Sequence, residues 1–169
     1  MNTIETIRTR RSIRKYKKRP VPEKMMTELL RAAMSAPSAG NQQPWHFVII
    51  GDRAILDEIP NIHPYAAMCH QAPSAILVCG DPSHEKHPGF WVQDCSAATM
   101  NLLLAAHDIG LGAVWVGIYP REDRVKDFRK LLRLPEQIIP LALVPIGYPA
   151  IKVAPEDRYK EKRVHYNGW

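Results

Sequence analysis

The chain has few of the residues that mark secreted or metal-binding proteins. Its 169 residues include only three cysteines, Cys69, Cys79 and Cys95. An odd number of cysteines without C-x-x-C spacing excludes a complete intrachain disulfide framework and a cysteine-based zinc or iron–sulfur site. We therefore expect three reduced thiols, as in a protein of the reducing cytosol.

Long hydrophobic runs are lacking as well. Residues 141–144 are apolar but lie between Pro140 and Pro145, far short of the roughly 20 residues that cross a membrane. Arginines precede any apolar stretch near the N-terminus, so no signal peptide is expected. These features predict a cytoplasmic protein with no membrane partner.

The motifs of several common catalytic sites are also missing. The sequence contains no G-x-G-x-x-G, no P-loop and no G-x-S-x-G nucleophile elbow. Its histidines form no H-x-x-x-H pair, and His84, Glu85 and His87 in one polar loop are too weak a pattern to predict a metal site. Because few polar residues remain for acid–base chemistry, we expect a cofactor to supply the reactivity and expect no metal.

Positive charge is concentrated in one short segment. The net charge is +6, and eight of the 23 basic residues fall between Arg8 and Arg19, where there is no acid. The other residues hold 15 basic against 17 acidic side chains. A basic run is typical of a solvated face or a nucleic-acid site. Here the interleaved Ser12, Ile13 and Tyr16 favour a shaped anion site instead.

Hydrophobic periodicity predicts one domain over residues 1–169, with an α+β sheet flanked by helices. Helices are expected at 2–9, from 21–23 to a stop at 36–37, at 90–109 and at 122–132. Strands are expected at 45–50, 74–79, 113–118 and 141–146. The helix at 90–109 is so apolar that we expect it to run through the core or between subunits.

Three segments have the chemistry to hold a cofactor. The first contains Arg10, Arg11, Ser12 and Arg14, whose guanidinium groups and hydroxyl suit a phosphate. The second is the polar loop at 37–45, whose amides and hydroxyl suit the carbonyls and ring nitrogens of a heterocycle. In the third, at 115–120, a glycine lets the backbone approach a flat ligand closely.

These three segments carry a family resemblance. The runs R-R-S-I-R-K-Y, A-P-S-A-G-N-Q-Q-P-W-H-F and G-L-G-A-V-W-V-G-I-Y-P, in that order, resemble the FMN-dependent nitroreductase family. The likeness extends from about Ile4 to Trp169, and the chain is similar to the short members of the family. The resemblance implies a nitroreductase-like fold, a central mixed or antiparallel sheet flanked by helices, and a homodimer with two FMN sites at the shared interface.

The resemblance also assigns roles to individual residues. It implies that Arg10, Arg11 and Ser12 bind the FMN phosphate and ribityl chain, and that Arg14 lies beside the pyrimidine edge of the flavin. It implies further contacts from the loop of the other chain and from the third segment and the C-terminal region: Pro37, Ser38, Ala39, Asn41, the backbone of Val116 and Gly117, and Arg158, with Lys160 a weaker candidate.

The function implied is an oxidoreductase that takes hydride from NAD(P)H and passes electrons to nitroaromatics, quinones or a similar electron-poor small molecule by a ping-pong mechanism. One alternative keeps the fold and flavin but changes the reaction, to dehalogenation, flavin fragmentation or dehydrogenation. The other is a basic nucleic-acid-binding protein that uses Arg8 to Arg19, although we expect no nucleic-acid partner.

Overall fold

The apolar runs of the chain form a five-stranded antiparallel sheet. The structure is a computed structural model that describes residues 2–169. Its strands are β1 (Trp45–Ile50), β2 (Ser74–Gly80), β3 (Gly112–Ala113), β4 (Val116–Gly117) and β5 (Ile139–Gly147). Their order is β1-β2-β5-β3, and β4 also pairs with β5. All pairs between these strands are antiparallel, and an isolated bridge from Ser12 to Ala113 is parallel.

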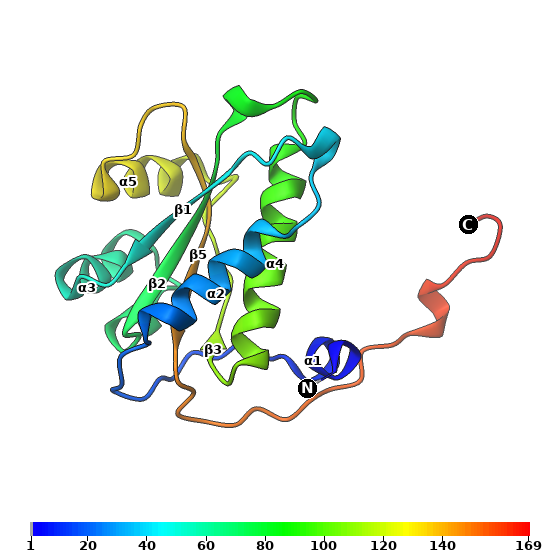
Figure 1. Cartoon of the computed structure of the whole chain (residues 1–169), viewed down its shortest axis with the longest axis horizontal. Helices are drawn as coiled ribbons and strands as arrows, with labels where there is room; N and C mark the ends of the chain where they lie inside the picture. The colour runs from blue at the N-terminus through cyan, green and yellow to red at the C-terminus, as the bar shows by residue number, and fades with distance from the viewer. Residues whose placement is uncertain (1) are drawn as a thin grey trace.

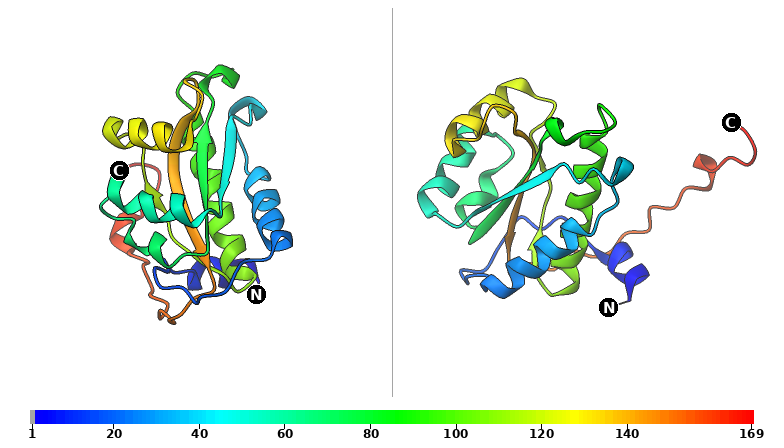
Figure 2. Two further views of the ribbon diagram at one scale, coloured as in Figure 1. Left: turned by 90° about the vertical axis from the view of Figure 1, so that its left-hand side faces the viewer. Right: turned by 45° about the horizontal axis from the view of Figure 1, so that its top comes forward.

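Helices cover both faces of this sheet (Figures 1 and 2). The α-helices are α1 (Thr3–Thr9), α2 (Glu23–Met34), α3 (Arg53–Ile62), α4 (Trp91–Asp108) and α5 (Glu122–Leu132). The short 3-10 helices are η1 (Ala39–Asn41), η2 (Ala67–His70), η3 (Pro82–His84) and η4 (Glu161–Arg163). Helices α2 and α4 pack on one face, and α3 and α5 on the other. The expected α+β fold is confirmed.

Strand β2 is buried on both faces because it lies between two helical layers. Ile76 and Val78 pack with α2 and α4, whereas Leu77 and Cys79 pack with α3 and α5. A strand buried on both faces needs apolar side chains at every position rather than at every second one. This explains why 74–79 reads as a continuous apolar run.

Helix α4 is the long apolar helix that the sequence predicts. It spans 18 residues, and its buried side chains include Cys95, Ala98 and Leu102. Gly110 follows with a φ of 82°, the left-handed conformation that glycine adopts most readily after a helix. Five apolar residues on the rest of its surface are only half-buried in the single chain: Val92, Ala97, Met100, Leu104 and Ala105.

The strand expected at 113–118 is split into β3 and β4. Gly112 pairs with Gly147 and Val116 pairs with Leu143, so both short strands keep one register against β5. In that register Val114 stands opposite Pro145, which has no N–H to donate. The Pro145 carbonyl accepts a hydrogen bond from Tyr16 Oη at 3.1 Å. The ladder is therefore interrupted at this position.

The three cysteines are free and buried, as expected. Burial raises the pKa of Cys69, Cys79 and Cys95 to about 12. A thiol with such a pKa carries almost no reactive thiolate near neutral pH. None of the three is therefore suited to nucleophilic chemistry.

The C-terminal segment leaves the body of the protein. Residues 150–169 are exposed throughout. They pass α1 and then extend away from the sheet and helices (Figure 1). Several large apolar side chains in this arm are exposed, among them Tyr159, Tyr166 and Trp169. Within residues 2–169, no helix has the length and apolar character needed to span a bilayer.

At position 80 the fold leaves no room for a side chain. A Cβ at Gly80 would lie 2.3 Å from Trp91 Cε3, whereas a Cβ at Gly51 would meet no atom within 4 Å. We predict that Gly80→Ala lowers the free energy of unfolding by about 1–3 kcal/mol, because overpacking forces the Trp91 ring to move. Gly51→Ala is the matched control and should change it by less than about 0.5 kcal/mol. Denaturant midpoints measure both, and equal midpoints for the two variants would contradict the packing described.

Candidate functional site

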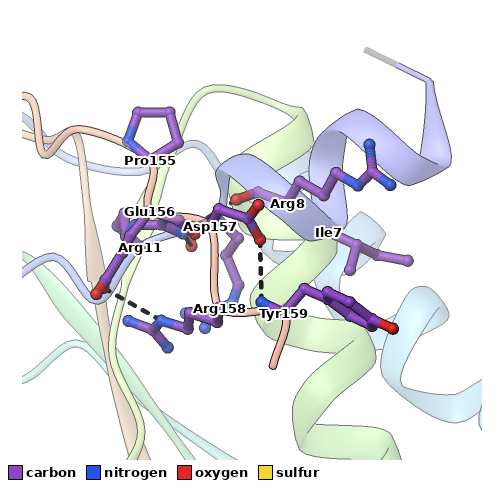
Figure 3. Close-up of a pocket in the computed structure, with 9 residues that line it drawn as sticks. Ile7, Arg8, Arg11, Pro155, Glu156, Asp157, Arg158 and Tyr159 are labelled. Atoms are coloured by element: carbon purple, nitrogen blue, oxygen red, sulfur yellow. Dashed lines mark hydrogen bonds and ion pairs between the residues drawn. The ribbon is translucent and has the colours of Figure 1, made fainter. Parts of the chain in front are cut away.

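Three arginines predicted to bind phosphate come together beside α1. Arg10, Arg11 and Arg158 line a cavity of about 760 Å³. Its other lining residues come from α1 and from the first part of the exposed arm (Figure 3). Arg10 is the C-cap residue of α1, and Arg158 belongs to the arm. A helix end and a C-terminal segment far apart in sequence thus form one basic cavity.

Arg10 is the best candidate for an anion ligand in this cavity. Its Nε atom is buried and has no hydrogen-bond partner among residues 2–169. Burial, followed by the charges of Arg11 and Arg158, lowers the pKa of Arg10. A buried donor without a partner costs about 1–3 kcal/mol or more. An oxyanion would supply that partner and offset the repulsion among the three guanidinium groups, so the cavity fits a phosphate.

Arg11 uses most of its donors within the chain. Its Nε donates to Ala154 O at 3.0 Å and its Nη2 to Glu156 O at 3.1 Å. Its Nη1 donates to Arg10 O at 2.7 Å and Arg8 O at 3.1 Å. A guanidinium carries five N–H donors, so one N–H of Nη2 is left over for an anion. Arg11 mainly fastens the arm to the end of α1.

Among the other candidates, the basic side chains are exposed. Arg14 is exposed, and Ser12 is half-buried beside Ala113. Arg158 Nε lies 3.3 Å from Glu156 Oε2, with both side chains well exposed. Lys160 is exposed further along the arm. The structure therefore brings Arg158 to Arg10 and Arg11, but not Lys160.

The polar loop at 37–44 is held by a buried carboxylate. Asp94 Oδ1 accepts from Ala39 N at 2.9 Å, and Oδ2 accepts from Gln42 Nε2 at 2.7 Å. Gln42 Oε1 in turn accepts from the backbone N–H groups of Lys86 and His87, at 2.9 and 3.2 Å. This network joins the loop both to the first turn of α4 and to the segment after β2.

The same loop contains an unusual backbone conformation. Gly40, Asn41 and Gln43 all have φ between 48° and 54°. Non-glycine residues adopt this left-handed region at a cost, and such positions cluster at ligand-binding sites. Ser38 Oγ accepts from Gln43 N at 3.0 Å, which holds the turn closed. Pro37 and Asn41 remain exposed, while Ser38 and Ala39 are half-buried.

The third segment offers an open strand edge. Gly117 is exposed, and a Cβ there would meet no atom within 4 Å, whereas Val116 is buried. Gly117 O accepts from Arg124 Nη1 at 3.1 Å and contacts His63 Nε2 at 2.9 Å. His63 Nδ1 accepts from Tyr65 N, so its Nε2 is the protonated nitrogen that donates to Gly117. The backbone at Gly117 is therefore fixed and its outer face is free.

The two groups of predicted residues lie at opposite ends of α4 within one chain. Thr9, next to Arg10, has its Oγ1 atom 2.8 Å from Nε2 of His107 in the last turn of α4. Ala39 instead bonds Asp94 in the first turn. The 18 residues of α4 correspond to about 27 Å at 1.5 Å per residue. The structure thus brings Arg10, Arg11 and Arg158 together but leaves the loop at 37–44 far from them.

Sequence reasoning missed Asp94, Gln42 and His63. A signal for Asp94 was present, because a carboxylate within an apolar helix must find hydrogen-bond donors if it is buried. It is 5% exposed. For His63 nothing in the sequence distinguishes a buried histidine from an exposed one. Its partner, the carbonyl of Gly117, lies 54 residues away.

An antiparallel sheet between helical layers, with a basic cavity at one end of α4 that fits a phosphate, defines an α+β class of protein. Comparison with known proteins identifies the particular family. The model of the nitroreductase family matches residues 7–67 and 61–148, and this chain belongs to that family.

Individual relatives agree with this assignment. A protein of Methanothermobacter thermautotrophicus, provisionally named an NADH dehydrogenase/NAD(P)H nitroreductase, is 53% identical over all of this chain and 88% of its own length. A solved structure from Parabacteroides distasonis with the same provisional name has 47% identity, a TM-score of 0.96 and full coverage of both chains. A provisionally named nitroreductase from Desulfovibrio desulfuricans, solved in complex with FMN, has 28% identity and a TM-score of 0.85 over 100% of this chain and 99% of that one.

The buried carboxylate of Asp94 yields a test of the loop network. We predict that Asp94→Ala lowers the free energy of unfolding by about 2–3 kcal/mol, because the Ala39 N–H and the buried Gln42 amide both lose their acceptor. Asp123→Ala is the control, since Asp123 is exposed and forms a surface ion pair with Arg121. The control should cost less than about 1 kcal/mol. Urea denaturation measures both values, and equal losses would show that the network does not hold the loop.

Proposed function

We propose that this chain is an NAD(P)H-dependent FMN oxidoreductase that reduces electron-poor small molecules such as nitroaromatics and quinones. The observation that carries the proposal is the buried, unpartnered Nε of Arg10 in a cavity shared with Arg11 and Arg158. The membership in the nitroreductase family and the FMN complex of the Desulfovibrio relative support it. When bound, FMN supplies the centre that accepts and returns the hydride.

The residues of the chain have three tasks in this proposal. Arg10, with Arg158 and the free donor of Arg11, holds the phosphate, and Ser12 binds the ribityl chain. Arg14 places a positive charge beside the pyrimidine edge of the flavin, which favours the form that carries added negative charge. Val116 and Gly117 present backbone rather than side chains to the ring, and the hydrogen bond from His63 keeps that backbone in place.

The second half of the cofactor site comes from another copy of the chain. The loop that carries Pro37, Ser38, Ala39 and Asn41 is separated from Arg10 by the length of α4, so one chain cannot close both halves around one cofactor. The exposed apolar side chains of the arm and the half-buried apolar residues of α4 favour burial against a partner. We therefore propose a homodimer with two shared sites.

The open face at Gly117 leads to the kinetic proposal. One accessible face serves NAD(P)H first and the acceptor afterwards, so the nicotinamide must leave before the acceptor enters. Such alternation predicts ping-pong kinetics. No protein nucleophile takes part, which agrees with the buried cysteines and their raised pKa values.

The proposed activity has a direct spectroscopic test. We predict that NADH or NADPH bleaches the flavin absorbance of the FMN-loaded protein under anaerobic conditions, and that a nitroaromatic or a quinone restores it. Initial rates measured against NAD(P)H concentration, at several fixed acceptor concentrations, should give parallel lines in a double-reciprocal plot. A flavin that stays oxidised with both nicotinamides would overturn the proposed function. Intersecting lines would overturn only the ping-pong order.

The role of Arg10 has its own test. We predict that Arg10→Ala raises the dissociation constant of FMN by about 10- to 100-fold, because hydrogen bonds to a charged group contribute about 1.5–3 kcal/mol. Arg31→Ala is the matched control: Arg31 is an exposed arginine on α2 that pairs with Glu28, and its loss should leave the constant within about twofold. Flavin fluorescence titration of the apoprotein measures both. Similar constants for the two variants would remove Arg10 from the site.

A further inference from the structure

Two histidines and a carboxylate that have no role in the proposed cofactor site converge next to the loop at 37–44. His46 lies on β1, while Asp81 and His84 lie just after β2 and in η3. The Nε2 atoms of both histidines are 3.9 Å from Asp81 Oδ2. One ligand atom from each of the three residues lies within 4.8 Å of the others. These are the side-chain types that bind zinc and other first-row transition metals.

The carboxylate of Asp81 is held in one orientation. It is 6% exposed, and its Oδ1 accepts from Ser83 N at 2.9 Å and Ser83 Oγ at 2.6 Å. Both bonds fall on Oδ1, so Oδ2 is left to face the two imidazoles. Metal-binding carboxylates commonly have such a hydrogen bond on the oxygen that does not bind the metal. The serine thus supplies the outer support of a metal ligand.

The backbone keeps the three residues at this spacing. His46 pairs with Cys79 in the β1–β2 ladder. Asp81 N donates to Pro44 O at 2.8 Å, which extends the contact between the two strands by one step. His84 N donates to Asp81 O at 3.1 Å. The ligand atoms are therefore brought together by the sheet and its following turn rather than by flexible side chains alone.

The polar loop that holds His84 also contains Glu85 and His87, which do not join this cluster. The Glu85 carboxylate accepts from Trp91 N at 2.7 Å and Gly89 N at 3.2 Å, so it is hydrogen-bonded to the start of α4 instead. His87 instead lies against Phe90, with ring centroids 6.3 Å apart. The residues that converge with His84 are His46 on β1 and Asp81 just after β2. The position of His46 beside His84 cannot be predicted from the sequence around His84.

We propose that His46, Asp81 and His84 bind one divalent transition-metal ion, such as Zn²⁺, with water in the remaining positions. Metal–ligand bonds of about 2.0–2.2 Å in a tetrahedral site place ligand atoms about 3.3 Å apart. Each imidazole must therefore approach Asp81 Oδ2 by about 0.6 Å from 3.9 Å. Their side chains are 49% and 55% exposed, so they are free to make this shift.

A bound ion would connect η3 to β1. The segment after η3 already contacts the loop at 37–44 through Gln42, which accepts from Lys86 N and His87 N. Tying His84 to His46 would limit the movement of this segment. Because an ion that binds only the folded protein stabilises it by mass action, saturating Zn²⁺ should raise the melting temperature.

The test uses the purified full chain after removal of metals with a chelator. Isothermal titration with Zn²⁺ should show one ion bound per chain with a dissociation constant in the micromolar range or below, and Co²⁺ should give the visible absorption of a bound ion. His46→Ala, Asp81→Asn and His84→Ala should each weaken binding by about tenfold or more. Far-UV circular dichroism and the melting temperature without metal show whether each variant is folded.

Two control variants make the outcome decisive. His87→Asn removes a histidine of the same loop outside the cluster. His70→Asn removes an exposed histidine whose Nδ1 lies 3.1 Å from the carboxylate of Asp57, outside the cluster. Both should bind Zn²⁺ as the unchanged chain does. Binding only at millimolar Zn²⁺, or equal weakening by the controls and by His84→Ala, would overturn the proposal, since it would show non-specific binding by surface histidines.

Discussion

The structure depends on one constraint, the burial of α4 between the sheet and α2. The side of this helix that faces the core must be apolar, and a buried polar group on it must be hydrogen-bonded. Asp94 in its first turn meets that requirement by accepting from Ala39 and Gln42. Its last turn lies against α1, where the basic cavity begins. The length of α4 thus sets the distance between the two halves of the proposed site.

That distance connects the fold to assembly. The arginines at one end and the strained loop at the other cannot both reach the same cofactor in one chain. A two-fold arrangement of chains solves this geometry, because each end then meets the opposite end of the partner. It would also cover the half-buried residues of α4 and the exposed arm. Both cofactor binding and dimer formation would then depend on the length of α4.

Much of this could be predicted from the sequence because the signals are local. The run at 74–79, the apolar helix at 90–109 and Gly110 at its end each specify their own conformation. Helix α3 could not be predicted with the same ease, since Pro60 stands inside it. Proline is normally a helix breaker, because it has no N–H to donate to the carbonyl four residues earlier, yet α3 continues past it to Ile62. The interruption at Val114 depends on Pro145 across the ladder, which only the register reveals.

In the candidate site too, local features could be predicted from the sequence and tertiary contacts could not. The basic residues Arg10 and Arg11 stand out by composition, and Arg158 could be placed only through a family resemblance. What the sequence does not contain is the direction of each side chain. Arg11 donates hydrogen bonds to backbone carbonyls of the arm. His63 donates one to the carbonyl of Gly117 from another part of the chain. Such contacts follow from tertiary packing and not from any local pattern.

A mixed dimer tests the central claim, that each cofactor site is built from two chains, most directly. One chain would carry Arg10→Ala and the other Asn41→Ala, with different affinity tags to isolate the mixed species. If the sites are shared, one site collects both substitutions and the other has neither, so half of the FMN should bind with the affinity of the unchanged protein. If each site belongs to one chain, both sites are damaged. No fraction of FMN would then bind with the original affinity, and the account would be contradicted.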